Sequence, residues 1–255
     1  MKKIILFLCV ILLCNPVFSV DKKYANSGAD VSQISLIRRY KDISHNLIVI
    51  NKMKTQTRQL SEEDKSIIKK YVFGAVRGED TYLLMNCHLR GNLQHYIPKK
   101  EITTPLKCRL DYYVDALTKP VSKVKLPQNM ILYRGVDEKG IKQIFKINEV
   151  QSIANKPVNE TNLAVLKQKL DGAIYEEKGF MSTSYNKNCA KKTKFMFEVN
   201  APKGLHAVLL EDIGKQVEKE VLINRGTKWE VTDVYLDTDK SNKRKFYVIK
   251  VKFVK

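Results

Sequence analysis

The chain has 255 residues, of which 44% are hydrophobic and 29% charged, and these proportions exclude an intrinsically disordered protein. Its length suits one ordinary domain or two small ones and allows a sizeable core. A formal net charge of +19 is compatible with nucleic acid, an anionic membrane surface or a phosphate-rich ligand as partner. The lysines are scattered and do not form one stripe interleaved with aromatic residues, so we expect no nucleic-acid partner.

The N-terminus has the pattern of a secretory signal peptide. Two lysines precede the apolar run 4–13, and side chains of small or moderate size follow at 17–19, where a signal peptidase would cut. The run is shorter than the roughly 20 apolar residues that span a bilayer. Cys14 also suggests a lipoprotein anchor, but the leucines before it are bulkier than such a site prefers. The sequence predicts a signal peptide at residues 1–19 and a secreted mature protein, residues 20–255, without a stable membrane anchor.

The cysteines outside this segment are too few and too dispersed for a structural framework. They are Cys87, Cys108 and Cys189, an odd number without Cys-x-x-Cys spacing. This argues against a disulfide scaffold and a zinc site, while one bridge with one spare thiol stays open. The four histidines are equally dispersed, so we expect no metal.

The first half of the chain is helical in pattern. Ser61 with acidic residues after it predicts a helix N-terminus, and apolar residues follow at helical spacing. Further helices are predicted within 81–93 and 106–117. Residues 121–129 have the composition of a connector.

From residue 130 onward, short apolar runs between turn signals predict strands, with one helix at about 160–175. Helices followed by a run of strands are typical of an α+β fold with a mostly antiparallel sheet. We expect one domain with a helical part at about 30–120 and a sheet part at about 130–255. The predicted strands are 130–133, 180–184, 195–199, 206–210, 220–223, 228–236 and 245–254.

Several familiar catalytic motifs are absent, among them the Rossmann and P-loop glycine patterns. Two short motifs with polar groups stand out instead. Arg134 and Gly135 end an apolar strand, where a guanidinium can grip phosphate bidentately. Ser182 and Ser184 share one face of the next predicted strand, and Thr183 points to the other face. Each motif alone also fits an ordinary surface strand.

A third motif places Glu218 and Glu220 two residues apart before a hydrophobic strand. On an extended segment both carboxylates face the same way. Like charges so close raise the pKa of one of them, which suits acid/base and cation-stabilising chemistry. An isolated Glu-x-Glu is otherwise a solvated acidic pair.

The order and spacing of the three motifs resemble those of the arginine-clade bacterial mono-ADP-ribosyltransferase toxins. These include the enzymatic components of actin-modifying binary toxins and the relatives of the clostridial Rho-modifying exoenzymes. Residues 82–91 look like the family's helix beside the NAD cleft, and residues 220–229 look like its strand-turn-strand after the glutamates. The resemblance covers residue 61 to the C-terminus. It implies the ADP-ribosyltransferase fold, in which N-terminal helices precede two packed, mainly antiparallel sheets around an NAD cleft.

The resemblance implies NAD⁺ as substrate and assigns residues to bind it. Arg134 matches the arginine that contacts the NAD phosphates, with Gly135 beside it. Ser182 matches the serine that orients the catalytic glutamate, and Thr183 and Ser184 support the strand. Further candidate NAD contacts on the helix are Asn86 and Arg90.

The two glutamates take separate roles in the family. Glu220 matches the catalytic glutamate, which hydrogen-bonds the nicotinamide-ribose 2′-hydroxyl and stabilises the oxocarbenium-like cation left when nicotinamide departs. Glu218 matches the glutamate linked to arginine acceptors, whereas relatives that modify asparagine carry glutamine there. A guanidinium is protonated at neutral pH, so a carboxylate beside it can take its proton during attack.

Two loops are expected to shape substrate use. Residues 185–194 correspond to the phosphate–nicotinamide loop, whose lysines can neutralise pyrophosphate. Residues 211–217 correspond to the loop that meets the target protein. This version has no aromatic residue there, so the sequence does not point to the same target as its relatives.

The sequence therefore predicts a secreted, monomeric toxin-type enzyme that transfers ADP-ribose from NAD⁺ to an arginine of a eukaryotic host protein, with accompanying NAD⁺ hydrolysis. We expect no room for a receptor-binding or translocation domain, so the enzyme either enters cells by a route of its own, relies on a separate delivery component, or acts outside cells. Two alternatives remain: an NAD glycohydrolase and a secreted basic binding protein without enzymatic activity.

Overall fold

The computed structural model describes residues 47–76, 78–214, 218–239 and 241–255. The predicted signal peptide and the beginning of the predicted helical part lie outside the described residues. Residues 48–255 form one compact unit.

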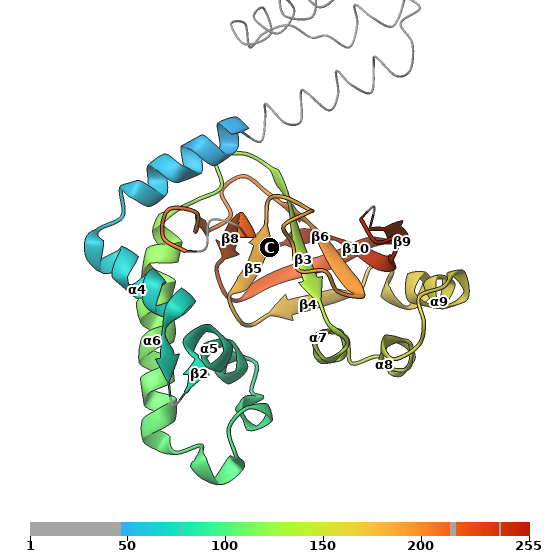
Figure 1. Ribbon diagram of the computed structural model, residues 1–255, viewed down its shortest axis with the longest axis horizontal. Helices are drawn as coiled ribbons and strands as arrows, with labels where there is room; N and C mark the ends of the chain where they lie inside the picture. The colour runs from blue at the N-terminus through green and yellow to red at the C-terminus, as the bar shows by residue number, and fades with distance from the viewer. Residues whose placement is uncertain (1–46, 77, 215–217, 240) are drawn as a thin grey trace, which may run out of the picture. The chain divides into compact units, whose positions relative to one another are not determined.

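Helices dominate the first half of the described chain (Figure 1). Residues 48–58 are helical. Ser61 then caps the next helix, because its hydroxyl accepts a hydrogen bond from the backbone N–H of Asp64, as the sequence predicted. The elements of this part are α4 (Glu62–Phe73), β1 (Ala75–Val76), β2 (Glu79–Asp80), α5 (Thr81–Leu89), the short 3₁₀ helices η1 (Leu93–His95) and η2 (Lys99–Glu101), and α6 (Thr104–Lys123).

Helix α6 is longer than the sequence indicated. It passes through Pro120 and ends at Lys123, so the beginning of the predicted connector 121–129 is helical. A proline inside a helix removes one backbone hydrogen bond. Pro120 and Val121 are both buried, and Val121 packs into the core that α6 shares with α4 and α5, which helps to offset the loss.

The second half supplies the strands and three further helices. The helix predicted at 160–175 ends at Leu170, because Gly172 takes a left-handed backbone conformation (φ 67°) that stops it. Three elements were not predicted: α7, α8 and β4. The elements are β3 (Met130–Val136), α7 (Glu138–Ile144), α8 (Asn148–Ala154), α9 (Glu160–Leu170), β4 (Ile174–Glu177), β5 (Met181–Ser184), β6 (Phe195–Ala201), β7 (Ala207–Leu209), β8 (Glu220–Ile223), β9 (Thr227–Thr238) and β10 (Lys245–Val254).

Eight strands form a sheet in the order β4-β9-β10-β6-β3-β5-β8-β7, and only the β10–β6 pair is parallel. Strands β3 and β5 join at a single residue pair, Tyr133 with Ser184. The sheet therefore consists of a five-stranded part and a three-stranded part that meet at this pair. The predicted α+β fold, with N-terminal helices followed by mainly antiparallel strands, is confirmed, and the two sheets expected are joined into one at this pair.

The three-stranded part lies between two hydrophobic cores because its side chains alternate. On β8, Val221 and Ile223 pack into the core shared with the five-stranded part and α7–α9. Leu222 points the other way and packs with α4, α5 and α6. Figure 1 shows these two groups of helices on different sides of the strands.

Leu222→Ala should lower the free energy of unfolding by about 3 kcal/mol, the usual loss for truncating a buried leucine. Leu222 is fully buried, so the change leaves a cavity between the strands and the helices. Urea denaturation measures the effect. Ile174→Ala is the control, because Ile174 is 61% exposed on the edge strand β4 and its truncation should change stability little. Equal losses in the two variants would contradict this account of the core.

Candidate functional site

A pocket of about 530 Å³ opens where β3 and β5 separate. Beyond the Tyr133–Ser184 pair, Arg134 on β3 and Thr183 on β5 are no longer hydrogen-bonded to each other across the gap. Helices α4 and α5 close one side of the pocket. All eight predicted site residues line it: Asn86, Arg90, Arg134, Gly135, Ser182, Thr183, Glu218 and Glu220.

The hydroxyl groups of β5 are divided between the pocket and the backbone. Ser182 is exposed and lines the pocket. The buried Thr183 donates to the carbonyl oxygen of Val221 (2.6 Å) and ties β5 to β8. Ser184 Oγ lies 2.9 Å from the carbonyl oxygen of Glu218 and accepts a hydrogen bond from the backbone N–H of Asn186. Ser184 therefore holds the chain segment that carries the two glutamates.

The segment from Glu218 to Glu220 is not extended throughout, because a turn at Lys219 separates Glu218 from the strand that begins at Glu220, so the conformation predicted for this motif is wrong. Strand β8 begins at Glu220, and Lys219 before it has a φ of 51°. This left-handed conformation is uncommon for a residue other than glycine and costs energy. Glu218 and Glu220 nevertheless line the same pocket. The turn replaces the alternation of a strand as the reason that they meet.

Gly135 is required by the close approach of another backbone segment. A Cβ atom at this position would lie 2.0 Å from the carbonyl oxygen of Lys191 and 2.8 Å from Thr193 Oγ1. The loop 185–194 therefore crosses β3 at Gly135, next to Arg134. Only a residue without a side chain permits this approach.

The lysines of the loop 185–194, which the sequence analysis considered as partners of the pyrophosphate, are mostly bound to the protein itself. Lys187 pairs with Asp237 (2.6 Å), and Lys192 pairs with Asp239 (3.2 Å). Lys194 is buried and donates to the carbonyl oxygen of Ala154 at the end of α8. Lys191 is the lysine of this loop that lines the pocket.

A buried carboxylate that the sequence analysis missed holds both arginines of the pocket. Glu177, at the end of β4, is 4% exposed and accepts hydrogen bonds from Arg90 Nε (2.9 Å), Arg134 Nη1 (3.1 Å) and the backbone N–H of Gly179 (2.9 Å). Burial alone would raise the pKa of Glu177, but the charges of Arg134 and Arg90 outweigh it and hold the pKa below the ordinary value of 4.5. Glu177 therefore fixes two guanidinium groups from different elements.

Asn86 joins the helical side of the pocket to the strands. Its side-chain oxygen accepts from the backbone N–H of Phe180 (2.8 Å), and its amide donates to the hydroxyl of Tyr71 (3.0 Å). Gly179 passes close by, because a Cβ there would lie 2.6 Å from the Asn86 oxygen. These contacts hold α5 against the beginning of β5, and both elements line the pocket.

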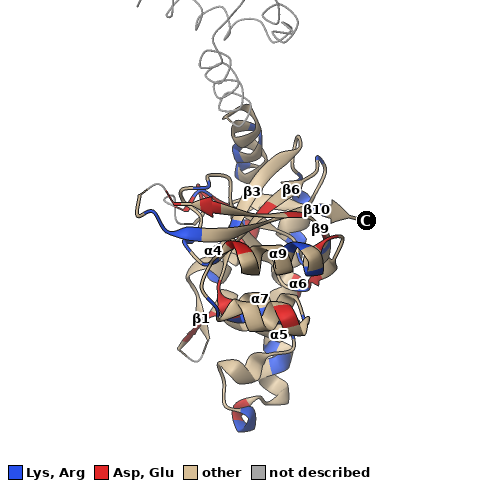
Figure 2. Cartoon of the chain, turned by 90° about the vertical axis from the view of Figure 1, so that its right-hand side faces the viewer, with Lys and Arg blue, Asp and Glu red and all other residues tan. Residues whose placement is uncertain are grey.

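The described residues include no group of three or more His, Cys, Asp or Glu side chains able to hold a metal ion. The cysteines at positions 87, 108 and 189 are free thiols. No helix in the part of the chain that the structure describes is long and apolar enough to cross a membrane. Figure 2 shows Lys and Arg distributed over helices and strands rather than gathered on one element.

Comparison with known proteins decides the family. A family model described as ADP-ribosyltransferase exoenzyme matches residues 39–255. The chain belongs to the ADP-ribosyltransferase exoenzyme family. The reaction of this family draws ADP-ribose from NAD⁺, so the predicted family and substrate are both confirmed. No curated protein sequence matches the chain.

Solved ADP-ribosyltransferase structures share the fold. Plx2a, a toxin from Paenibacillus larvae, is 21% identical with a TM-score of 0.63, and the match covers 84% of this chain and 97% of Plx2a. C3stau2 of S. aureus, solved with NAD, is 19% identical with a TM-score of 0.63 and coverages of 84% and 96%. BECa, from a binary enterotoxin of C. perfringens and solved with NADH, is 19% identical with a TM-score of 0.62 and coverages of 83% and 48%.

Glu177→Gln should destabilise the protein and weaken NAD⁺ binding, because the arginines of the pocket lose their counter-charge. Removing one partner of a buried ion pair costs about 3 kcal/mol. The folded pKa of Glu177 lies below 4.5, so its stabilisation is fully present above that pH and is lost as the pH falls through the folded pKa. Urea denaturation at several pH values and the KM for NAD⁺ measure both effects. Glu176→Gln, at the exposed neighbouring position, is the control. Matching pH profiles for parent and Glu177→Gln would contradict the prediction.

Gly135→Ala should weaken NAD⁺ binding by displacing the loop 185–194. The new methyl group would overlap the carbonyl oxygen of Lys191, and a backbone atom cannot move aside without moving the loop. Calorimetric titration with NAD⁺ measures the affinity, and the melting temperature reports the strain. An unchanged affinity would show that the loop does not support the pocket.

Proposed function

We propose that the protein is a secreted, toxin-type enzyme that transfers ADP-ribose from NAD⁺ to an arginine of a eukaryotic host protein and releases nicotinamide. The observation that carries the proposal is the pocket that unites Arg134, Ser182, Glu218 and Glu220. Its volume of about 530 Å³ lies within the usual range of ligand sites, about 300–1,000 Å³.

Binding of NAD⁺ depends on the cationic wall of the pocket. Arg134 donates to Glu177 through Nη1. We assign its remaining N–H groups to the pyrophosphate, because a guanidinium carries five donors in a planar fork. Arg90 lies beside it and shares the same carboxylate, so the two positive charges converge on one region of the pocket. Asn86 is a further candidate contact on α5.

Bond cleavage is assigned to Glu220 with Ser182. The bond between ribose C1′ and the nicotinamide nitrogen breaks, its electron pair leaves with neutral nicotinamide, and positive charge develops on the ribose. The Glu220 carboxylate, fixed at the beginning of β8 and buried to 8% exposure, stabilises this charge and accepts from the ribose 2′-hydroxyl. Ser182, two residues before the Ser184 that faces Glu220 in the sheet register, orients the carboxylate.

Transfer to arginine is assigned to Glu218. The acceptor guanidinium nitrogen forms a bond to ribose C1′ and loses one proton, which the Glu218 carboxylate accepts. A glutamine could not accept this proton, so the carboxylate at position 218 favours arginine over an amide acceptor. When water takes the place of the acceptor, the same site hydrolyses NAD⁺.

Secretion and action on host cells complete the proposal. They are supported by the signal-peptide pattern at residues 1–19 and by relatives that are toxins, such as Plx2a. BECa belongs to a binary enterotoxin, and C2-I is the enzymatic component of the C2 toxin of Clostridium botulinum. By analogy, a separate delivery component would bring the enzyme to its target. The enzyme itself is proposed to be a monomer.

Transfer from labelled NAD⁺ to agmatine, a small guanidino acceptor, tests the proposal on residues 20–255. We expect the parent protein to transfer ADP-ribose. Glu218→Gln should lose transfer and keep part of the NAD⁺ hydrolysis, since Glu220 remains. Glu220→Gln should lose at least about 100-fold in both reactions, the usual effect of removing a group that stabilises transition-state charge.

Two other outcomes would replace the proposal. Hydrolysis of NAD⁺ without transfer to agmatine or to host proteins would make the protein an NAD glycohydrolase. Salt-sensitive binding to heparin or DNA without any NAD⁺ turnover would make it a basic binding protein.

A further inference from the structure

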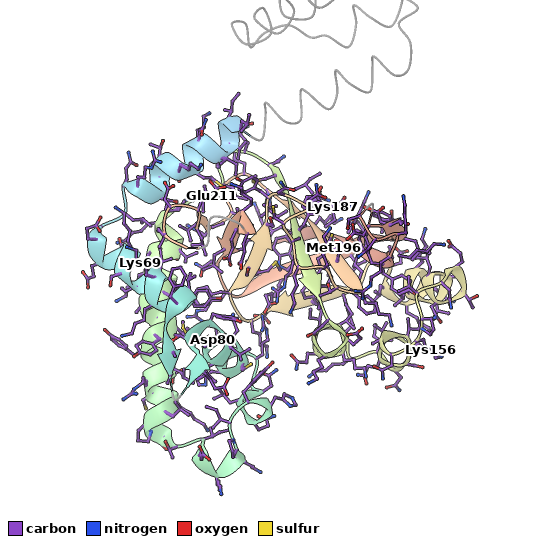
Figure 3. All side chains as sticks on the ribbon, in the orientation of Figure 1. Lys69, Asp80, Lys156, Lys187, Met196 and Glu211 are labelled. Atoms are coloured by element: carbon purple, nitrogen blue, oxygen red, sulfur yellow. The ribbon has the colours of Figure 1, made fainter. Side chains whose placement is uncertain are left out.

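Glu211 is a buried carboxylate beside the pocket to which the proposed reaction gives no role. It follows β7 and is 5% exposed. Its carboxylate receives three donors from three parts of the chain: Lys54 Nζ (2.6 Å), Lys219 Nζ (2.9 Å) and the hydroxyl of Tyr185. Figure 3 shows Glu211 between the strands and the helix of residues 48–58, which carries Lys54.

The register of the sheet explains why Glu211 meets Lys219. Leu209 pairs with Val221, and the backbone N–H of Leu210 donates to the carbonyl oxygen of Glu220 (2.9 Å). The next residues along the two antiparallel segments are Glu211 and Lys219. Opposite charges facing each other across antiparallel segments stabilise the pairing.

Lys219 needs such support because its backbone is strained. Its φ of 51° costs on the order of 1–3 kcal/mol for a residue other than glycine and persists only where surrounding contacts enforce it. One contact is the hydrogen bond from the backbone N–H of Tyr185 to the carbonyl oxygen of Lys219 (3.1 Å). A second is the hydrogen bond from the hydroxyl of Ser184 to the same carbonyl oxygen (3.3 Å), and a third is the ion pair of the Lys219 side chain with Glu211. Glu211 binds the side chain of Tyr185 as well, so it fixes both partners of the hydrogen bond between Tyr185 and Lys219.

The two catalytic candidates depend on this turn to different degrees. Glu220 belongs to β8, where its neighbours on both sides are fixed: Ser184 pairs with it on β5, and Leu210 donates to it. Glu218 precedes the turn and lies outside the strand. The conformation of Lys219 therefore sets the direction of the chain between Glu218 and β8. Loosening the turn should displace Glu218 more than Glu220.

We propose that Glu211 is a positioning residue that holds Glu218 against the acceptor through Lys219 and so determines how ADP-ribose is divided between acceptor and water. This inference rests on the proposed function, in which Glu218 serves the acceptor and Glu220 serves cleavage. Glu211 does not touch the reacting atoms in this scheme.

The charge of Glu211 is constant under working conditions. Burial would raise its pKa, but the hydrogen bonds from Lys54, Tyr185 and Lys219 lower it to about 2. The carboxylate is therefore ionised at neutral pH. Its replacement should change the partition between transfer and hydrolysis without shifting the pH profile of either reaction.

The test compares Glu211→Gln with the parent and with Asp64→Asn on residues 20–255. Asp64 is a matched control, because it is also a buried carboxylate paired with a lysine, Lys123 (2.6 Å), and it lies at the N-terminus of α4 outside the pocket lining. Transfer to agmatine and nicotinamide release without acceptor are measured separately, with KM and kcat for each. Melting temperatures show whether each variant is folded.

We expect Glu211→Gln to lose between about tenfold and a hundredfold in transfer, the loss that follows when a catalytic group is misplaced by about 1 Å. Hydrolysis and the KM for NAD⁺ should stay near the parent values. Asp64→Asn should keep the parent ratio of transfer to hydrolysis. Lys219→Met should reproduce the change, and the double variant should lose no more than either single one, because both remove the same interaction.

Equal losses of transfer and hydrolysis in Glu211→Gln, or no loss in either, would overturn the inference. If Glu211→Gln does not fold, Lys219→Met decides, because the Lys219 side chain is 39% exposed and its replacement leaves the core intact. Failure of the proposed function is recognised separately: the parent itself would then hydrolyse NAD⁺ without transferring to agmatine.

Discussion

The cleft of this protein depends on how little of the sheet joins its two parts. Strands β3 and β5 pair at Tyr133 and Ser184 alone, where β5 ends, and no pair follows between Arg134 and Thr183. In a continuous sheet, hydrogen bonds would join the two strands along their length. Here the space between them is a pocket, and residues of both parts of the sheet line it. The two hydrophobic cores fix the position of the three-stranded part, since the side chains of β8 point alternately into one core and the other. The strands and the helices α4 and α5 together line this opening.

Buried carboxylates organise the polar groups around the opening. Glu177 holds Arg90 and Arg134 on one side, and Glu211 holds Lys219 on the other. Each carboxylate receives donors from segments far apart in the sequence, so each sets the position of several chain segments at once. Burial makes these contacts strong only while every partner is present. The groups that would meet NAD⁺ and the acceptor are therefore arranged before either substrate binds, which is the form of preorganisation that electrostatic catalysis requires.

The sequence was sufficient for the fold class and for choosing eight residues that line one pocket, and part of the reason is local. Ser61 indicates a helix start because its own side chain caps the helix. The strand β10 is indicated by the alternating pattern of its side chains. The resemblance in motif order then predicted that residues distant in the sequence share one site. The role of Glu177 was not predicted, because it depends on two arginines from other elements. The turn residues Asp171 and Gly172 could have predicted the strand that carries Glu177, but not this role. The conformation of Lys219 also escaped, since a left-handed lysine has no signature in the sequence and is imposed by tertiary contacts.

Most lysines of the loop 185–194 are bound within the protein, and this affects how strongly the basic protein attracts acidic molecules. The formal charge of +19 treats every lysine alike. Lys187 and Lys192, however, are neutralised at short range by Asp237 and Asp239, and Lys194 is turned inward to the end of α8. Charges paired in this way contribute little to the field at a distance of a Debye length, about 8 Å in physiological salt. Long-range attraction to an acidic surface is accordingly weaker beside the pocket than the composition suggests. Recognition of another molecule beside the pocket therefore depends mainly on the shape of the surface and on the few charged side chains that line the pocket.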